Sequence, residues 1–290
     1  MSFQKTIKEP IEFKGVGLHN GIEVNLCLKP AETNFGIKFK RIDIADDTKN
    51  IIDANYKNVS SPILCTKIKN SYGVSVSTIE HLMAAFYGED IDNVLVEVDA
   101  PELPIMDGSA FDFVESIRSV GKEKQNCPKK FIKVLKKVEL KDGEKYISIE
   151  PLQKDLIIDF EIVYKNPLIR TRRKEFKLST GDLTSIYNSK TFCLYEDIDQ
   201  IKSQGLAKGG SLENAIVVKE NKILDCLGDL MLSGFRIFGH VKTSQGGHLL
   251  TNALLKEFLT DKSNWEFEKT ERKEKDNKDS NYISPVAVNA

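Results

Sequence analysis

Short stretches of alternating apolar and polar residues run through the first half of the chain, and the period changes once to that of a helix. Alternation at residues 22–28 and a valine-rich run at 94–98 predict strands. Between them, apolar residues recur at i, i+3, i+4 and i+7, namely Ile79, Leu82, Met83 and Phe86. This spacing predicts a helix from about Thr78 to Tyr87 with one face toward the core. A second helix is predicted at residues 111–120.

The second half repeats this order of strands before helices. Its patterns predict strands at 131–139, 146–150 and 156–163, and helices at about 222–233 and 247–258. Between them and the first half, residues 121–130 are polar and have no periodicity, which indicates a domain boundary. We therefore predict an α+β protein with domains at 1–125 and 126–290. Residues 266–280 are almost all charged or polar and are predicted to form a solvated loop.

Composition narrows the class of protein. The chain has 290 residues, 40% hydrophobic and 29% charged, which is enough apolar surface for a folded core. Its 42 Lys+Arg and 43 Asp+Glu residues leave a formal charge of −1, so a nucleic-acid partner is not expected. The first ten residues contain no apolar stretch, so no secretion signal is expected, and no run of about 18 apolar residues predicts a membrane span. Five dispersed cysteines predict reduced thiols and a cytoplasmic location.

The helix predicted near residue 80 carries candidate chemistry on its polar side. His81 lies nearly opposite the apolar stripe, among the small residues Ala84, Ala85 and Gly88, and Glu80 lies beside it. Small residues around a histidine allow another group to approach closely. The alternative is an exposed histidine on the outer side of a helix.

The helix predicted near residue 225 has a similar polar side. Asn221, Asp225 and Asp229 follow one another at four-residue intervals, and two bare carboxylates at that spacing repel. A cation or a histidine nearby would explain them, although a solvated acidic face remains the alternative. A further histidine, His248, follows two glycines at the start of the next predicted helix, whereas His240 is expected in a strand. Together these groups resemble the ligands, base and acid of a metal-assisted hydrolase.

The glycine-rich stretch Gly15–Gly21 does not match a dinucleotide-binding loop. Its third glycine falls one place late, and the following segment alternates like a strand rather than forming a helix. We therefore predict a hairpin turn there, and a nucleotide-dependent oxidoreductase is disfavoured.

Longer motifs add a family resemblance to this interpretation. They include STIEHLMAA at 77–85, IDN at 91–93, PELPIMDGS at 101–109, KTF at 190–192, GLAKGGSLENA at 205–215 and GGH at 246–248. The chain resembles the UDP-3-O-acyl-N-acetylglucosamine deacetylases, zinc enzymes of lipid A synthesis in Gram-negative bacteria. The resemblance implies two α+β domains, each a sheet layered on helices, with the active site between them. It also implies Zn²⁺ as cofactor and UDP-3-O-acyl-N-acetylglucosamine as substrate.

The resemblance also implies roles for individual residues. His81 and Asp225 would bind the metal, Glu80 would act as the base, and His248 would act as the acid, oriented by Asp229. Thr191 would stabilise the oxyanion of the tetrahedral intermediate. Residues 192–217 would form a hydrophobic passage for the acyl chain. The implied substrate-binding residues are Leu18, Phe192, Ile198, Leu206, Gly210, Ser211, Ala215, Val217 and Lys222.

Two positions depart from the family pattern. The family carries a histidine four residues before the aspartate ligand, and this chain has Asn221 there, after a shortened connection. Gln245 stands where a basic residue is common. Because a catalytic zinc usually has three protein ligands, we expect this chain to hold zinc weakly. The alternative function is a relative that binds the UDP-sugar or acyl chain without turnover.

Overall fold

The computed structural model describes residues 2–163, 171–190, 203, 205–211 and 221–268. In the first half, five strands form a sheet in the order β2-β3-β9-β4-β5. Its inward side chains, such as Val24, Leu26 and Leu28, are fully buried beneath two helices. The elements are β2 (Ile11–Val16), β3 (Glu23–Pro30), β4 (Ile37–Arg41), β5 (Ile51–Asp53), α1 (Glu80–Gly88), β9 (Val94–Val98) and α2 (Phe111–Val120).

The second half contains a seven-stranded sheet with β16 near its centre, paired with β11, β13 and β14. Ile149, Ile158 and Val241 are fully buried on the face that the helices cover. The elements are β11 (Phe131–Val134), β12 (Val138–Asp142), β13 (Lys145–Pro151), β14 (Leu156–Ile162), β15 (Arg172–Lys177), α3 (Leu183–Tyr187), α5 (Asn221–Met231), β16 (Arg236–Ser244), α6 (His248–Thr260) and β17 (Trp265–Phe267).

Two small sheets and two short 3-10 helices complete the described fold. β1 (Phe3–Ile7) pairs with β10 (Lys122–Pro128), and a three-stranded sheet contains β6 (Val59–Ser61), β7 (Lys67–Lys69) and β8 (Ser75–Val76). The 3-10 helices are η1 (Tyr56–Asn58) and η3 (Lys262–Asn264). None of the described helices is long and apolar enough to cross a membrane.

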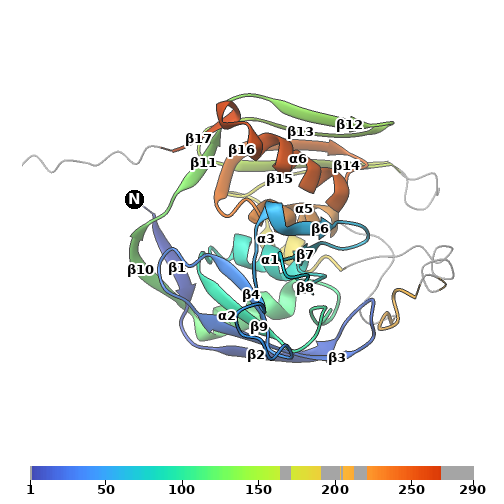
Figure 1. Cartoon of the computed structure of the whole chain (residues 1–290). Coiled ribbons are helices and arrows are strands. Elements are labelled where there is room, and N and C mark those ends of the chain that lie inside the picture. The colour runs from blue at the N-terminus through green and yellow to red at the C-terminus, as the bar shows by residue number, and fades with distance from the viewer. Residues whose placement is uncertain (1, 164–170, 191–202, 204, 212–220, 269–290) are drawn as a thin grey trace, which may run out of the picture.

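The helices of both halves lie between the two large sheets (Figure 1). In this view α1 and α2 cover the lower sheet, and α5 and α6 cover the upper one. Helices α1 and α5 approach very closely: a Cβ atom at Gly228 would lie 2.0 Å from the carbonyl oxygen of Glu80. Glycine at this position therefore allows the two helix backbones to touch, and it brings the polar side of α5 against the start of α1.

The α+β class is confirmed, and the predicted helices and hairpin are present. Three details were wrong. Residues 131–139 form parts of two strands, because the chain breaks pairing between Val134 and Val138. Residues 122–128 form a strand, whose mostly exposed side chains left no apolar alternation to detect. The boundary at 125/126 stays a prediction. Glu266 lies in β17 rather than in a loop, and residues 269–280 lie outside the described part of the chain.

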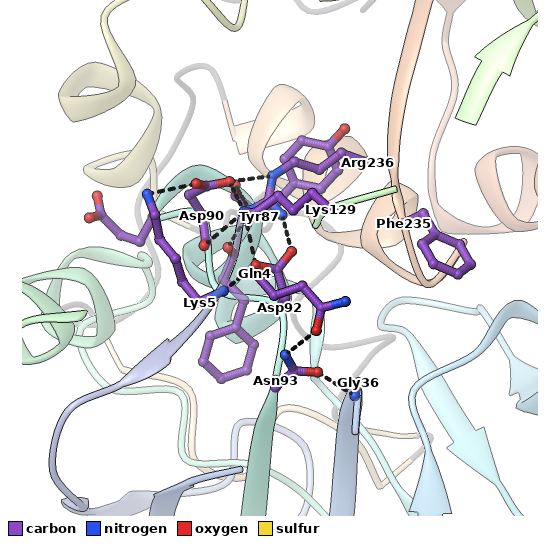
Figure 2. Close-up of polar contacts among 12 residues, drawn as sticks. Gln4, Lys5, Gly36, Tyr87, Asp90, Asp92, Asn93, Lys129, Phe235 and Arg236 are labelled. Atoms are coloured by element: carbon purple, nitrogen blue, oxygen red, sulfur yellow. Dashed lines mark hydrogen bonds and ion pairs between the residues drawn. The ribbon is translucent and has the colours of Figure 1, made fainter. Parts of the chain in front are cut away.

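A cluster of charged residues joins the two halves at the carboxyl end of α1 (Figure 2). Asp90 and Asp92 follow the helix and form ion pairs with Lys129 and Arg236, while Lys5 pairs with Asp90. Burial alone would raise the pKa of Asp90, but these three cations together lower it to about 2. The carboxylate is therefore stabilised in the folded protein.

This lowered pKa predicts how Asp90 contributes to stability as pH changes. A carboxyl group whose pKa is lower in the folded than in the unfolded chain stabilises the fold above the unfolded value of about 3.9. That contribution is lost as pH falls through the folded value near 2. We expect Asp90→Asn to lower the free energy of unfolding by about 1–3 kcal/mol at pH 6. In urea titrations the difference should shrink toward pH 2; a constant difference would contradict this assignment.

Candidate active site

The amino end of α1 places two functional side chains in the interior. Glu80 and His81 are its first two residues, and both are only 4% exposed. Thr78, just before them, has a φ of 58°, which turns the chain sharply into the helix. The alternative of an exposed histidine was wrong, because α5 packs against the side of α1 opposite its own sheet and buries His81.

Three more polar side chains meet α1 from the second half. Asp225 and Asp229 lie one turn apart on α5, and His248 is the first residue of α6. All three are buried, with Asp229 only 1% exposed. The alternative of a solvated acidic face on α5 is therefore wrong. Burial would raise the pKa of Asp225, but Lys222, His81 and His248 lower it well below its usual range.

His81 and Asp225 have the separation expected of two ligands to one metal. The Nε2 atom of His81 lies 3.6 Å from Oδ1 of Asp225. Two atoms that each lie about 2.0–2.1 Å from a tetrahedral zinc are about 3.3–3.5 Å apart. The Nδ1 atom of His81 is buried without a hydrogen-bond partner among the described residues. The chemistry and spacing of this pair therefore fit a zinc ion, with Asp225 ionised as a ligand must be.

Glu80 lies beside this pair, and the backbone of the preceding segment holds one of its carboxylate oxygens. Its Oε2 accepts a hydrogen bond of 3.0 Å from the backbone N–H of Thr66, and its Oε1 lies 3.7 Å from Nε2 of His248. Burial raises the pKa of Glu80 above its usual range, although His248 and His81 oppose this effect. A carboxylate with a raised pKa accepts a proton more readily, which suits a general base.

His248 is held as a cation by the carboxylates around it. Its Nδ1 donates to Oδ2 of Asp229 at 2.8 Å, and the hydroxyl of Thr66 donates to the other oxygen of that aspartate. Burial alone would lower the pKa of His248, but Asp229 and Glu80 raise it to about 10. The imidazolium Nε2 is thus directed toward Glu80 and Asp225, where it can act as an acid.

These residues open into a cavity of about 330 Å³ between the two halves. Two lysines reach its lining: Lys222, whose Nζ donates to Asp225 at 3.3 Å, and Lys145 on the β12–β13 hairpin. Ile63, which is 69% exposed, and Leu64 form an apolar edge. The cavity therefore combines a polar centre with cationic and apolar sides. Its lining residues are Pro62, Ile63, Leu64, Glu80, His81, Asp142, Lys145, Lys222, Asp225, Gln245, Gly246, Gly247, His248, Leu249 and Leu250.

Apart from Lys222, the predicted substrate-binding residues, together with the predicted oxyanion residue Thr191, fall into two groups. Leu18 and Gly210 lie together, because the turn between β2 and β3 contacts residues 207–210: the backbone N–H of Gly209 donates to the carbonyl of Leu18 at 3.0 Å. They do not line the cavity around Glu80, and their role, with that of Leu206 and Ser211, stays a prediction. Thr191, Phe192, Ile198, Ala215 and Val217 lie outside the described residues.

Within the described part of the chain, a second group of metal-binding residue types lies on the second sheet. Asp159, Glu175 and His240 project from adjacent strands, with side-chain ligand atoms within 4.8 Å of one another. Both carboxylate oxygens of Asp159 already accept from the guanidinium of Arg173. His240 alternates in β16 with the buried Val241, so this group faces away from α5 and α6. It is therefore separate from the site around Glu80.

Sequence reasoning missed two contributors to the site. Thr66 is fully buried and contacts Glu80, Asp229 and His248, yet nothing in its local sequence marks it. Lys145 reaches the cavity because β13 pairs with β16, which leads directly to His248. Its only sequence signal was a lysine after an Asp-Gly hairpin turn, which is a common surface feature.

The fold and the site together define a metal-dependent hydrolase. A histidine and an aspartate are placed to share a metal, and a separate glutamate and histidine can act as base and acid. Residues 4–260 match the model of the family described as LpxC, UDP-3-O-acyl N-acetylglycosamine deacetylase. The chain belongs to this family, which confirms the resemblance found in the sequence.

Individual relatives agree with this assignment over nearly their full lengths. A protein named UDP-3-O-acyl-N-acetylglucosamine deacetylase from Actinobacillus succinogenes is 41% identical, covering 94% of this chain and 95% of the relative. Proteins of the same name from Shewanella violacea and Haemophilus influenzae are 38% and 37% identical. The match to the Shewanella protein covers 92% of this chain and 92% of the relative, and the match to the Haemophilus protein covers 98% of each.

Proposed function

We propose that this chain removes the N-acetyl group of UDP-3-O-acyl-N-acetylglucosamine in lipid A biosynthesis, with zinc as cofactor. The observation that carries the proposal is the meeting of Glu80, His81, Asp225 and His248 in one buried site. A relative that only binds the substrate would not need both a base and an acid, so this geometry favours turnover. We place the activity in the cytoplasm, in keeping with the free thiols of the described cysteines.

The residues of the chain divide the reaction between them. His81 and Asp225 would hold the zinc. When bound, that ion lowers the pKa of water toward about 7 and polarises the amide carbonyl. Glu80 accepts the proton of the attacking water, and its raised pKa suits that step. His248 donates a proton to the departing nitrogen, so the amine leaves in neutral form, while Asp229 fixes the imidazole ring.

The cavity lining suits the rest of the substrate. The diphosphate of a UDP-sugar is an anion, and Lys145 and Lys222 supply positive charge at the cavity. The apolar edge at Ile63 and Leu64 is compatible with an acylated sugar. The longer acyl-chain passage at residues 192–217 remains part of the proposal.

The direct test is to incubate the purified chain and zinc with UDP-3-O-acyl-N-acetylglucosamine and to measure acetate and free amine. We expect the two products in equal amounts, together with loss of activity after chelation and its return with added zinc. Binding of the substrate without release of acetate would instead support the non-catalytic alternative.

A further inference from the structure

We propose that Arg236 is a positioning residue: by holding the carboxyl end of α1, it keeps Glu80 and His81 aligned with the groups on α5 and α6. The inference rests on the proposed function. Arg236 is the first residue of β16 and belongs to the second half, whereas α1 belongs to the first. Its side chain is 7% exposed and lies in the charged cluster between the halves (Figure 2).

The guanidinium of Arg236 binds α1 from two directions. Nη2 donates to the carbonyl oxygens of Tyr87 and Phe86 at 2.9 and 3.2 Å. These carbonyls are in the last turn of α1, where the helix dipole favours a cation, and they also accept hydrogen bonds from the backbone N–H groups of Ile91 and Asp90 just past the helix. The other nitrogens face carboxylates just past the helix, with Nε 3.0 Å from Asp90 and Nη1 3.0 Å from Asp92. One side chain therefore holds both the helix end and the segment after it.

Ile237, the residue after Arg236, adds a second contact between β16 and α1. The backbone N–H of Ile237 donates to the hydroxyl oxygen of Tyr87 at 3.1 Å, and the guanidinium of Arg236 lies 5.3 Å from the centre of the same ring. The side chains of Tyr87 and Arg236 are both buried, so water is excluded from their contact. The start of β16 and the end of α1 are thus joined through backbone and side-chain atoms together.

Other cations support the carboxylates from different directions. Lys129, in the connection between β10 and β11, contacts Asp90 and lies 2.9 Å from Asp92, and its side chain is almost fully buried. On β1, Lys5 pairs with Asp90 at 2.8 Å, and its backbone N–H donates to Asp92. Arg236 differs from both because it alone among these three cations also binds the helix carbonyls.

The position of Arg236 in the chain explains how it acts on the distant site. It lies between α5, which carries Asp225 and Asp229, and α6, which begins with His248 at the other end of β16. Helix α1 is nine residues long and carries Glu80 and His81 at its opposite end, about 12 Å away at 1.5 Å per residue. A short helix moves as a unit, so release of its carboxyl end would shift both side chains relative to Asp225 and His248.

The test compares Arg236→Gln and Arg236→Lys with the control Arg173→Gln. The control removes another arginine that binds a carboxylate bidentately in the same half, but it does not contact α1. At saturating zinc, we expect Arg236→Gln to lower kcat by about 10- to 100-fold with KM changed less than about twofold, because a displacement near 1 Å can cost about 10²-fold. Arg236→Lys keeps the charge but cannot reach all four partners, so a smaller loss is expected.

A second measurement does not depend on activity. Because His81 and Asp225 come from the two helices that Arg236 aligns, Arg236→Gln should weaken zinc binding by about 10-fold. This is the size of loss found when a residue that supports a metal ligand is mutated. The control should bind zinc like the parent chain.

If Arg236→Gln does not fold, Arg236→Lys serves for both measurements. Parent-like kcat and zinc affinity, or equal losses in Arg173→Gln, would overturn the proposal. A parent chain without acetate release would refute the proposed function, while the zinc measurement would still decide the role of Arg236.

Discussion

Replacement of Glu80 by glutamine is expected to lower kcat by about 10²-fold or more while the zinc content per chain stays nearly unchanged. Glutamine keeps the shape of the side chain and can still accept the hydrogen bond from Thr66, but it cannot take a proton from water. In the proposed site His81 and Asp225 hold the metal, so this substitution removes neither proposed ligand. Metal analysis and steady-state rates on the same sample check the expectation.

The matched control is Glu150→Gln, which makes the same substitution in a glutamate of the second sheet that pairs with Lys242. It should leave kcat close to that of the parent chain. If Glu80→Gln lost its zinc but kept its rate per bound metal, Glu80 would be a ligand rather than the base.

Conversion of Asn221 to histidine is expected to increase zinc affinity by at least about 10- to 100-fold. Loss of a residue that only hydrogen-bonds to a metal ligand already lowers metal affinity by that much, and a ligand itself should matter at least as much. Helix α5 begins at Asn221, so residues 221 and 225 are one helical turn apart, as two ligands on the same face require. The third protein ligand of a typical catalytic zinc would then be restored. The measurement is zinc per chain after dialysis against a mild chelator, for both proteins, with the rate measured in parallel.

Lys256→His is a suitable control, because Lys256 is an exposed residue of α6 outside the cavity lining and should gain no zinc. One tightly held zinc in the unmodified chain, with no gain in Asn221→His, would show that another residue completes the metal site.

Much of the architecture followed from local patterns. The spacing of Ile79, Leu82, Met83 and Phe86 identified α1, because a helix with one apolar face must bury that face. Strands β9 and β14 were predicted in the same way from apolar runs. Strand β10 was missed, since a strand exposed on both sides carries no apolar alternation.

The sequence by itself determined the family and the α+β class, because these depend on motifs and on short-range periodicity. It also predicted five residues that the fold brings together, namely Glu80, His81, Asp225, Asp229 and His248. Only the tertiary structure decided that His81 is buried, since a second helix covers the polar side of α1 where Gly228 leaves room for it. It also brought Thr66 to His248, 182 residues away, and joined Arg236 to the end of α1. Contacts between residues so distant along the chain depend on how sheets and helices pack, and no local pattern encodes them.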